Sequence, residues 1–135
     1  ARDLCLGRAG AGTLDISDGG LVRVAADLTV DYAGDGDSYI TMSTGGMLAL
    51  NGQADGSLEA FFGLVDGTDD IRYWDDDMSA WAPITDATLG EDYTLDYVTT
   101  GDLAGYTMLA VGIPEPATIL IMGCGAVGLI RRRRK

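Results

Sequence analysis

Apolar and polar residues alternate along two stretches of the N-terminal half, and the two stretches share one pattern. Residues 14–24 read LDISDGGLVRV and residues 40–50 read ITMSTGGMLAL, which align at a constant offset of 26 residues. Alternation with a period of two predicts strands with one apolar face, and the shared Ser-x-Gly-Gly sequence predicts a tight turn between them. The predicted apolar faces carry Leu14, Ile16, Val22 and Val24 in the first copy and Ile40, Met42, Leu48 and Leu50 in the second.

The length of this repeat favours one architecture. Repeats of about 20–50 residues are typical of solenoids, in which each unit covers the apolar face of the next. We therefore expect residues 1–50 to form right-handed β-solenoid coils. Because about three units are normally needed and residues 5–12 could end an earlier coil, we also expect further sequence upstream. A pair of ordinary β-hairpins in a sandwich is the alternative.

The pattern changes after residue 50. Ser57 is a suitable helix N-cap, and apolar residues then recur at the spacing of one helical face up to Gly67. Aromatic and β-branched residues predict strands over residues 71–74, 93–98 and 106–111. Residues 51–112 are therefore predicted to form a small helix-and-strand cap on the coils, and the fold class is predicted to be mainly β. The residues of the predicted helical face are Leu58, Phe61, Phe62 and Val65.

The charges divide the chain into an acidic body and a cationic end. Twenty of the 21 acidic residues lie in residues 1–112 beside only four cations, so this body has a net charge of −16. Such a body repels nucleic acid, whose binding depends on Lys and Arg meeting phosphate. The chain has no histidine, which removes the commonest general base and metal ligand. We therefore expect no nucleic-acid partner, no cofactor and no enzymatic activity.

The last 22 residues combine three features in a fixed order. The stiff tripeptide Pro114-Glu115-Pro116 precedes fourteen uncharged residues, 117–130, and five consecutive cations end the chain. An apolar segment with a cationic end is typical of a transmembrane helix whose cations stay on the cytoplasmic side, although this segment is short for a bilayer. A buried C-terminal helix or strand is the alternative. The predicted transmembrane residues are Ala117, Ile119, Leu120, Ile121, Met122, Val127, Leu129 and Ile130, and the predicted cytoplasmic stop is Arg131, Arg132, Arg133, Arg134 and Lys135.

This order of Pro-Glu-Pro, apolar stretch and arginine cluster resembles the PEP-CTERM sorting signal of proteins exported by Gram-negative bacteria. The resemblance covers residues 113–135. It implies that Pro114, Glu115 and Pro116 are recognised by exosortase, a membrane-embedded cysteine peptidase-like enzyme, which removes the tail. It also implies contact with the lipid bilayer, transit through the inner membrane, and delivery to the cell surface or extracellular matrix. Extracellular polysaccharide is then a candidate partner.

A second resemblance concerns the body. The strand–Gly-Gly–strand pattern, preceded by Gly10-Ala11-Gly12, is similar to the β-solenoid repeats of autotransporter passengers and of exported PEP-CTERM proteins. Together with the tail, this resemblance favours a structural protein of the cell surface or the extracellular matrix. A third possibility is a permanently anchored protein whose tail is never cut.

Acidic clusters are candidate Ca²⁺ sites because Ca²⁺ prefers oxygen ligands. Asp31, Asp35 and Asp37 surround two glycines in one loop, but the spacing of an EF-hand is absent, so a solvated turn is favoured. The acids of residues 66–70 and 75–77 have the same interpretation. Residues 123–128 match G-x-G-x-x-G, but the strand, helix and later acidic residue that dinucleotide binding requires are missing.

The alternative function is carbohydrate recognition. Paired carboxylates can cleave glycosidic bonds, and Trp74 and Trp81 could stack on a sugar ring, so a carbohydrate-binding module or a polysaccharide lyase-like fragment could be delivered by the same tail. Aromatic residues in a cap are, however, more often buried in its core. Sequence alone therefore favours the structural role.

Overall fold

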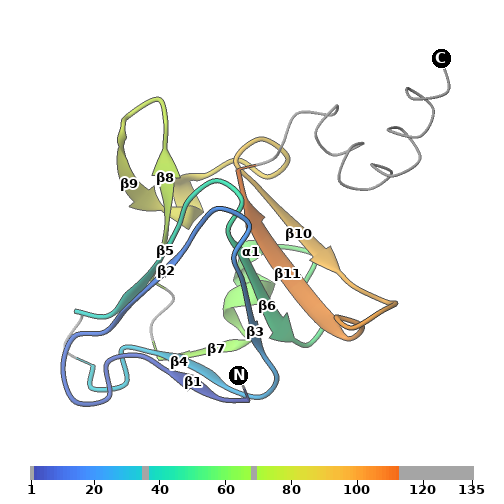
Figure 1. Ribbon diagram of the computed structural model, residues 1–135, viewed down its shortest axis with the longest axis horizontal. Coiled ribbons are helices and arrows are strands. Elements are labelled where there is room, and N and C mark those ends of the chain that lie inside the picture. The colour runs from blue at the N-terminus through green and yellow to red at the C-terminus, as the bar shows by residue number, and fades with distance from the viewer. Residues whose placement is uncertain (1, 35–36, 68–69, 113–135) are drawn as a thin grey trace, which may run out of the picture.

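The computed structural model describes residues 2–34, 37–67 and 70–112. These residues form three open β-sheets around one shared apolar core (Figure 1). The first sheet is entirely parallel. Its strands, in spatial order, are β1 (Leu4–Cys5), β4 (Leu28–Val30) and β7 (Val65–Gly67).

The other two sheets begin with parallel strands and are completed by antiparallel ones. In the second sheet, the first three strands are parallel and the last is antiparallel: β2 (Thr13–Ile16), β5 (Tyr39–Met42), β8 (Ile71–Asp75) and β9 (Ala80–Pro83). In the third sheet, the first two strands are parallel and two antiparallel strands follow: β3 (Leu21–Val24), β6 (Met47–Asn51), β11 (Tyr106–Val111) and β10 (Tyr93–Tyr97).

The two copies of the sequence repeat lie side by side in parallel register. Every aligned apolar pair is also a pair of register partners 26 positions apart, so the alignment is confirmed. The partners are Leu14 with Ile40, Ile16 with Met42, Val22 with Leu48, and Val24 with Leu50. Because the two strands of each copy belong to different sheets, the Ser-x-Gly-Gly segment turns the chain from one sheet to the next.

The fold is mainly β, as predicted, but the predicted right-handed β-solenoid coils are wrong. The three sheets are separate and open, and antiparallel strands complete two of them. The reason is that the chain reverses direction after β8 and again after β10, so that β9 and β11 occupy the edges of β8 and β6 that a further parallel unit would need. The resemblance to autotransporter repeats is therefore not supported.

Within residues 2–34, 37–67 and 70–112, none of the helices has the length and apolar character needed to span a bilayer. The predicted transmembrane segment, residues 117–130, and the cationic stop lie outside the described residues. So does the G-x-G-x-x-G match. The predicted division of the chain at residues 50 and 112 stays a prediction, and strands from both sides of residue 50 share all three sheets.

The predicted helix is present but shorter than expected. Helix α1 (Leu58–Phe62) begins after Ser57, whose Oγ accepts a hydrogen bond from the Ala60 N–H at 3.1 Å, so the N-cap is confirmed. The helix ends at Gly63 instead of Gly67, because residues 65–67 form β7 and pair with β4. A short 3-10 helix, η1 (Ile84–Asp86), follows β9.

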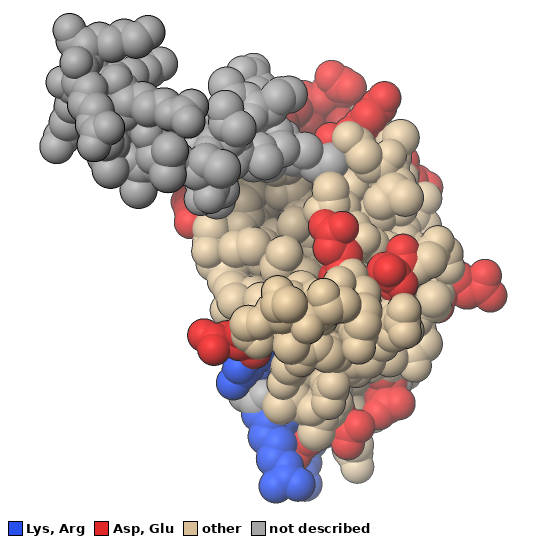
Figure 2. Space-filling view, turned by 90° about the vertical axis from the view of Figure 1, so that its right-hand side faces the viewer, with Lys and Arg blue, Asp and Glu red and all other residues tan. Residues whose placement is uncertain are grey.

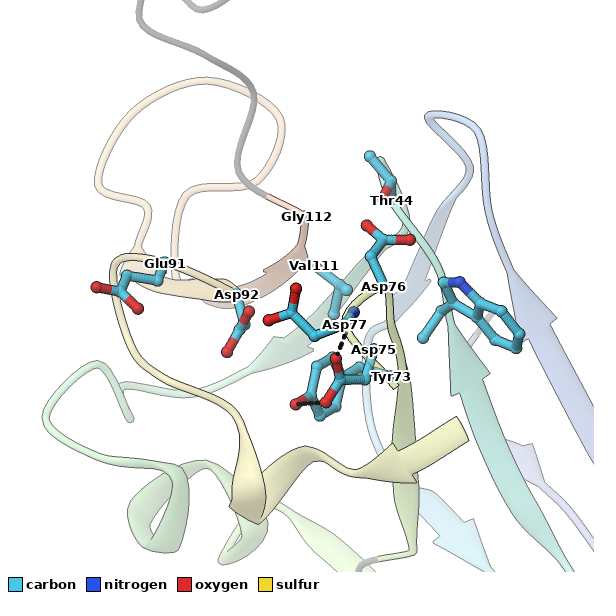
Figure 3. Close-up of a pocket in the computed structure, with 10 residues that line it drawn as sticks. Thr44, Tyr73, Asp75, Asp76, Asp77, Glu91, Asp92, Val111 and Gly112 are labelled. Atoms are coloured by element: carbon cyan, nitrogen blue, oxygen red, sulfur yellow. Dashed lines mark hydrogen bonds between the residues drawn. The ribbon is translucent and has the colours of Figure 1, made fainter. Parts of the chain in front are cut away.

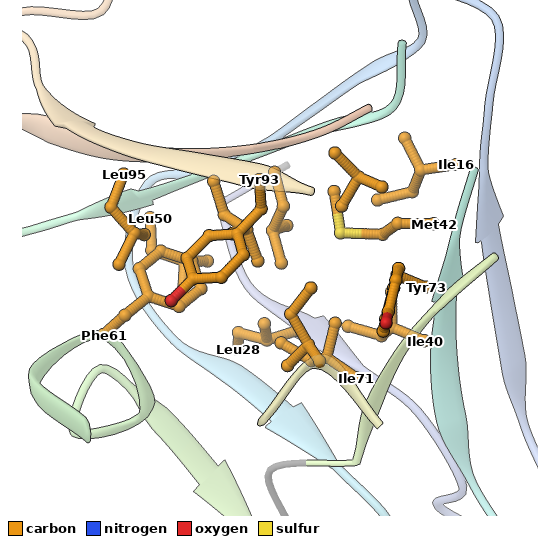
Figure 4. Close-up of a cluster of buried hydrophobic side chains, with 14 of the residues drawn as sticks. Ile16, Leu28, Ile40, Met42, Leu50, Phe61, Ile71, Tyr73, Tyr93 and Leu95 are labelled. Carbon is orange, nitrogen blue, oxygen red and sulfur yellow. The ribbon is translucent and has the colours of Figure 1, made fainter. Parts of the chain in front are cut away.

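The core collects side chains from all three sheets and from α1 (Figure 4). Phe61 from the helix is fully buried, as are Leu28, Ile40 and Leu48 from the first repeats. Two polar side chains of the described residues, Ser38 and Thr107 of β11, are also fully buried. The segments 71–74, 93–98 and 106–111 predicted as strands correspond to β8, β10 and β11, which confirms these three elements.

Candidate functional site

A pocket of about 350 Å³ lies where the β8–β9 hairpin, the loop before β10 and the end of β11 meet (Figure 3). Thr44, from the turn of the second repeat, also lines it. Half of its ten lining residues are acidic, so the pocket is strongly negative. These residues are Asp75, Asp76, Asp77, Glu91 and Asp92.

The hairpin side of the pocket is organised by Asp75. Its Oδ1 accepts hydrogen bonds from the backbone N–H groups of Asp77 at 3.0 Å and Met78 at 3.3 Å, which closes the turn between β8 and β9. Its Oδ2 accepts a hydrogen bond from the Tyr73 hydroxyl at 3.2 Å (Figure 3). Asp75 therefore holds the turn and orients Tyr73, which leaves Asp76 and Asp77 exposed at the rim.

The opposite side of the pocket is fixed by Asp92. Its Oδ2 accepts a hydrogen bond from the Thr88 N–H at 2.8 Å, which closes the loop before β10. Its backbone carbonyl accepts one from the Gly112 N–H, also at 2.8 Å. Gly112 has a φ of 68° and lies against the backbone of Thr44, where an added Cβ would be 2.7 Å from the Thr44 Cα. The last described residue is therefore held in the wall of the pocket.

The aromatic part of the site lies on the same hairpin. Trp74 and Trp81 are cross-strand partners, with ring centroids 5.3 Å apart and ring planes at 77°. Trp74 is 37% exposed and Trp81 is 43% exposed. The sequence favoured burial of both rings. They are partly exposed instead, because the alternation along β8 and β9 turns Tyr73 and Ala82 toward the core and the two tryptophans to the opposite face.

The candidate Ca²⁺ loop is described only in part. Asp31 is buried and Asp37 is exposed, whereas Asp35 lies outside the described residues. In the part of the chain that the structure describes, no group of three or more His, Cys, Asp or Glu side chains is arranged to hold a metal ion. In the cluster of residues 66–70, Asp70 forms a bidentate ion pair with Arg72, at 2.9 and 3.0 Å.

Two buried phenols near the pocket make stability depend on pH. Burial raises the pKa of Tyr73, with the carboxylates of Asp75, Asp92 and Asp86 adding to the rise, and burial also raises the pKa of Tyr93. Each phenol therefore keeps its proton to a higher pH in the folded protein than in the unfolded chain. This contribution to stability is complete below the unfolded pKa of about 10 and is lost as the pH rises through the folded pKa.

We accordingly expect the free energy of unfolding to fall as the pH is raised above about 10. Urea denaturation of the protein across this range measures the slope. The double variant Tyr73→Phe/Tyr93→Phe should show a shallower decline. The same slope in both proteins would contradict the assignment of the decline to these two side chains.

The sequence did not predict that these acidic residues form one pocket. It identified residues 75–77 as an acidic run, but it did not connect them with Glu91 and Asp92. The two groups belong to segments that join different sheets, and no spacing in the sequence indicates that they meet. The available signal was only that each acidic group directly follows or precedes a predicted strand.

Comparison with known proteins identifies one feature. Residues 112–135 match the family model of the PEP-CTERM protein-sorting motif, which supports a PEP-CTERM domain-containing protein. No curated protein and no solved structure matches the chain. Pro114, Glu115 and Pro116 lie within the matched range and outside the described residues, so their individual roles stay predictions. The match begins at Gly112, in the wall of the acidic pocket.

Proposed function

We propose that this chain is a non-enzymatic structural protein of the cell surface or extracellular matrix. Its sorting motif implies an exosortase-targeted exported protein that passes through the membrane of a Gram-negative bacterium. The observation that carries the proposal is the position of this motif, which starts at Gly112, the last residue that the structure describes. The body is therefore the cargo that the motif delivers.

The charge of the body supports a role outside the cell envelope. Residues 1–112 have a net charge of −16, and Figure 2 shows acidic side chains scattered over the face in view. A net charge far from zero keeps a protein soluble and limits non-specific association. Acidic residues favour solubility more than basic ones do, which suits a protein that must stay folded in a dilute, hydrated matrix.

Processing in a host that contains exosortase tests the delivery step. We expect the full chain to reach the surface fraction with an intact mass reduced by about the matched segment, and to keep its full mass in a host that lacks the enzyme. Glu115→Ala should abolish the mass change, whereas Asp102→Ala, in an exposed loop of the body, should leave it unaltered. A surface protein of full mass would indicate an uncut anchor and contradict processing.

The exposed tryptophans favour a second candidate function, recognition of extracellular polysaccharide. Trp74 lines the acidic pocket and Trp81 lies beside it on the edge strand. Aromatic side chains offer a large apolar face at low conformational cost, and carboxylates can accept hydrogen bonds from sugar hydroxyls. An aromatic pair beside a polar pocket has the composition expected of a glycan-binding surface.

A glycan array probed with the full chain separates the two candidates. Binding that is lost in Trp74→Ala and Trp81→Ala, and retained in Tyr32→Ala, would support recognition through the hairpin. Tyr32 is a suitable control because it is an exposed aromatic residue outside the pocket. Absence of binding to any glycan would leave the structural role as the proposed function.

A further inference from the structure

The outer face of the β8–β9 hairpin is an exposed aromatic surface. Trp74 and Trp81 are both exposed on it, and Met78 is exposed in the turn that joins the two strands. Single exposed apolar side chains are ordinary, whereas a contiguous exposed apolar surface with a polar rim marks an interaction site. The hairpin ends its sheet on the side away from β2, so the exposure of this face does not depend on what pairs with β2.

The two tryptophans are held in place by the protein itself. They are register partners on neighbouring strands, and their rings are in edge-to-face contact, which the charge distribution of aromatic rings favours. The turn beyond them is closed by Asp75, whose carboxylate accepts two backbone hydrogen bonds. Because the rings and the turn are already ordered, a ligand that binds this face loses little free energy to the ordering of the protein.

The pocket beside the hairpin gives this surface a negative charge that the described residues do not neutralise. The side chains of Asp76, Asp77 and Glu91 make no hydrogen bond or ion pair with other described residues. None of the four cations of the body lines the pocket. Arg72, although it lies on β8, is paired with Asp70 instead.

Carboxylates and an exposed indole favour the same ligand group, a protonated amine. An ammonium group donates hydrogen bonds to carboxylates, and it is attracted to the face of an aromatic ring, most strongly to that of tryptophan. In the described residues, the arginines that lie over aromatic rings, Arg23 and Arg72, lie over tyrosines. The same acidic side chains would repel a polysaccharide that carries carboxylates or sulfates.

We propose that the hairpin and its pocket bind an amino-sugar polymer whose amino groups are not acetylated. This inference rests on the second candidate function, glycan recognition, and names the class of glycan. The apolar face of a sugar ring packs on Trp74, and the ammonium group of the sugar lies among the carboxylates of the pocket. Figure 3 shows Asp77 pointing from the hairpin toward Asp92 across this space.

The size of the pocket favours a sugar ring over a segment of basic peptide. Its volume of about 350 Å³ is at the lower end of the range for small-ligand sites, about 300–1,000 Å³. It therefore suits one ring of a polymer whose next rings lie along the exposed hairpin. A sugar ring also carries its amine directly beside a flat apolar face, which matches an indole beside carboxylates. The cations of a peptide are placed on long, flexible stems.

Titration calorimetry of the full chain in non-ionic detergent tests the ligand class. The probes are a hexamer of glucosamine and the same hexamer with every amine acetylated, in mildly acidic buffer that keeps free amines protonated. Acetylation removes the charge and leaves the sugar ring, so the glucosamine hexamer should bind about tenfold more tightly. Trp74→Ala should weaken its binding by about tenfold.

The failure of this inference is distinguishable from the failure of glycan recognition. Equal affinity for the two hexamers, with loss of binding in Trp74→Ala, would overturn the inference and retain glycan recognition by the hairpin. Absence of binding to the glucosamine hexamer would also overturn the inference, and the glycan array would still decide whether another sugar is recognised. A hexamer of lysine that binds as tightly as the glucosamine hexamer would overturn it in favour of a basic peptide.

Matched neutral variants test whether the pocket supplies the attraction. Asp76→Asn/Asp77→Asn should weaken the glucosamine hexamer by about tenfold and leave the acetylated hexamer unaffected. The control, Asp96→Asn/Asp102→Asn, removes the same charge at exposed positions outside the pocket and should leave both affinities within about twofold. Circular dichroism confirms that each variant is folded. Equal weakening in the two double variants would show attraction to the overall charge of the body and would overturn the proposed site.

Discussion

Replacing Thr107 with valine should lower the free energy of unfolding by about 1.5–4.5 kcal/mol. Thr107 is fully buried in β11, where its Oγ1 donates a hydrogen bond to the Gly52 carbonyl at 2.6 Å and accepts one from the Ala54 N–H at 2.8 Å. Valine has nearly the same shape and supplies neither bond. The Ala54 N–H then loses its partner at a buried position, which costs about 1–3 kcal/mol. The part-buried Gly52 carbonyl loses a hydrogen bond worth about 0.5–1.5 kcal/mol.

The position of these two bonds explains why the effect should be large. They tie the segment between β6 and α1 to β11, across 55 and 53 residues of sequence. This segment brings Phe61 into the core, so its detachment would also disturb apolar packing. Urea denaturation gives the measurement, and Thr94→Val on the neighbouring strand β10 is the control, with an expected change below about 0.5 kcal/mol. A loss below about 1 kcal/mol in Thr107→Val would contradict the importance of this connection.

The local elements of the fold could be read from the sequence because their signals are local. The period-two pattern of the two repeats gave their strands and register, and the Ser57 N-cap gave the start of α1. Alternation, however, is the same in parallel and antiparallel strands. Nothing in residues 106–111 indicates that this strand reverses and pairs with β6. The architecture was therefore mispredicted from correctly identified strands.

The candidate site was less accessible to sequence reasoning than the fold. The pocket joins the turn at residues 75–77 to Asp92 and Gly112, and its formation depends on how the second and third sheets pack together. The exposure of Trp74 and Trp81 likewise depends on which face of the β8–β9 hairpin packs on the core. Only the sorting motif was recognisable in full, because its three features are adjacent in the sequence.

A second large loss of stability is expected on substitution of Gly45, where the turns of the two repeats stack. Gly19 and Gly45 occupy the same position in the two turns and have similar left-handed conformations, with φ of 80° and 88°. Their surroundings differ, because a Cβ at Gly45 would lie 2.8 Å from the backbone nitrogen of Gly19, whereas a Cβ at Gly19 would meet nothing within 4 Å. The two positions thus share the conformational cost of a side chain but differ in the collision that it causes.

Gly19→Ala should therefore lower the free energy of unfolding by about 1–2 kcal/mol, which is the strain of a left-handed non-glycine residue. Gly45→Ala should cost about 2–5 kcal/mol, because the stacked turns must also move apart and overpacking adds about 1–3 kcal/mol. Urea denaturation of both variants at one protein concentration measures the difference between their free energies of unfolding. Because the two glycines have the same backbone conformation, this difference reports the contact between the two turns alone. Equal losses would mean that the turn of the second repeat does not lie on the turn of the first, and the parallel register of the repeats would then have to be revised at this end of the sheets.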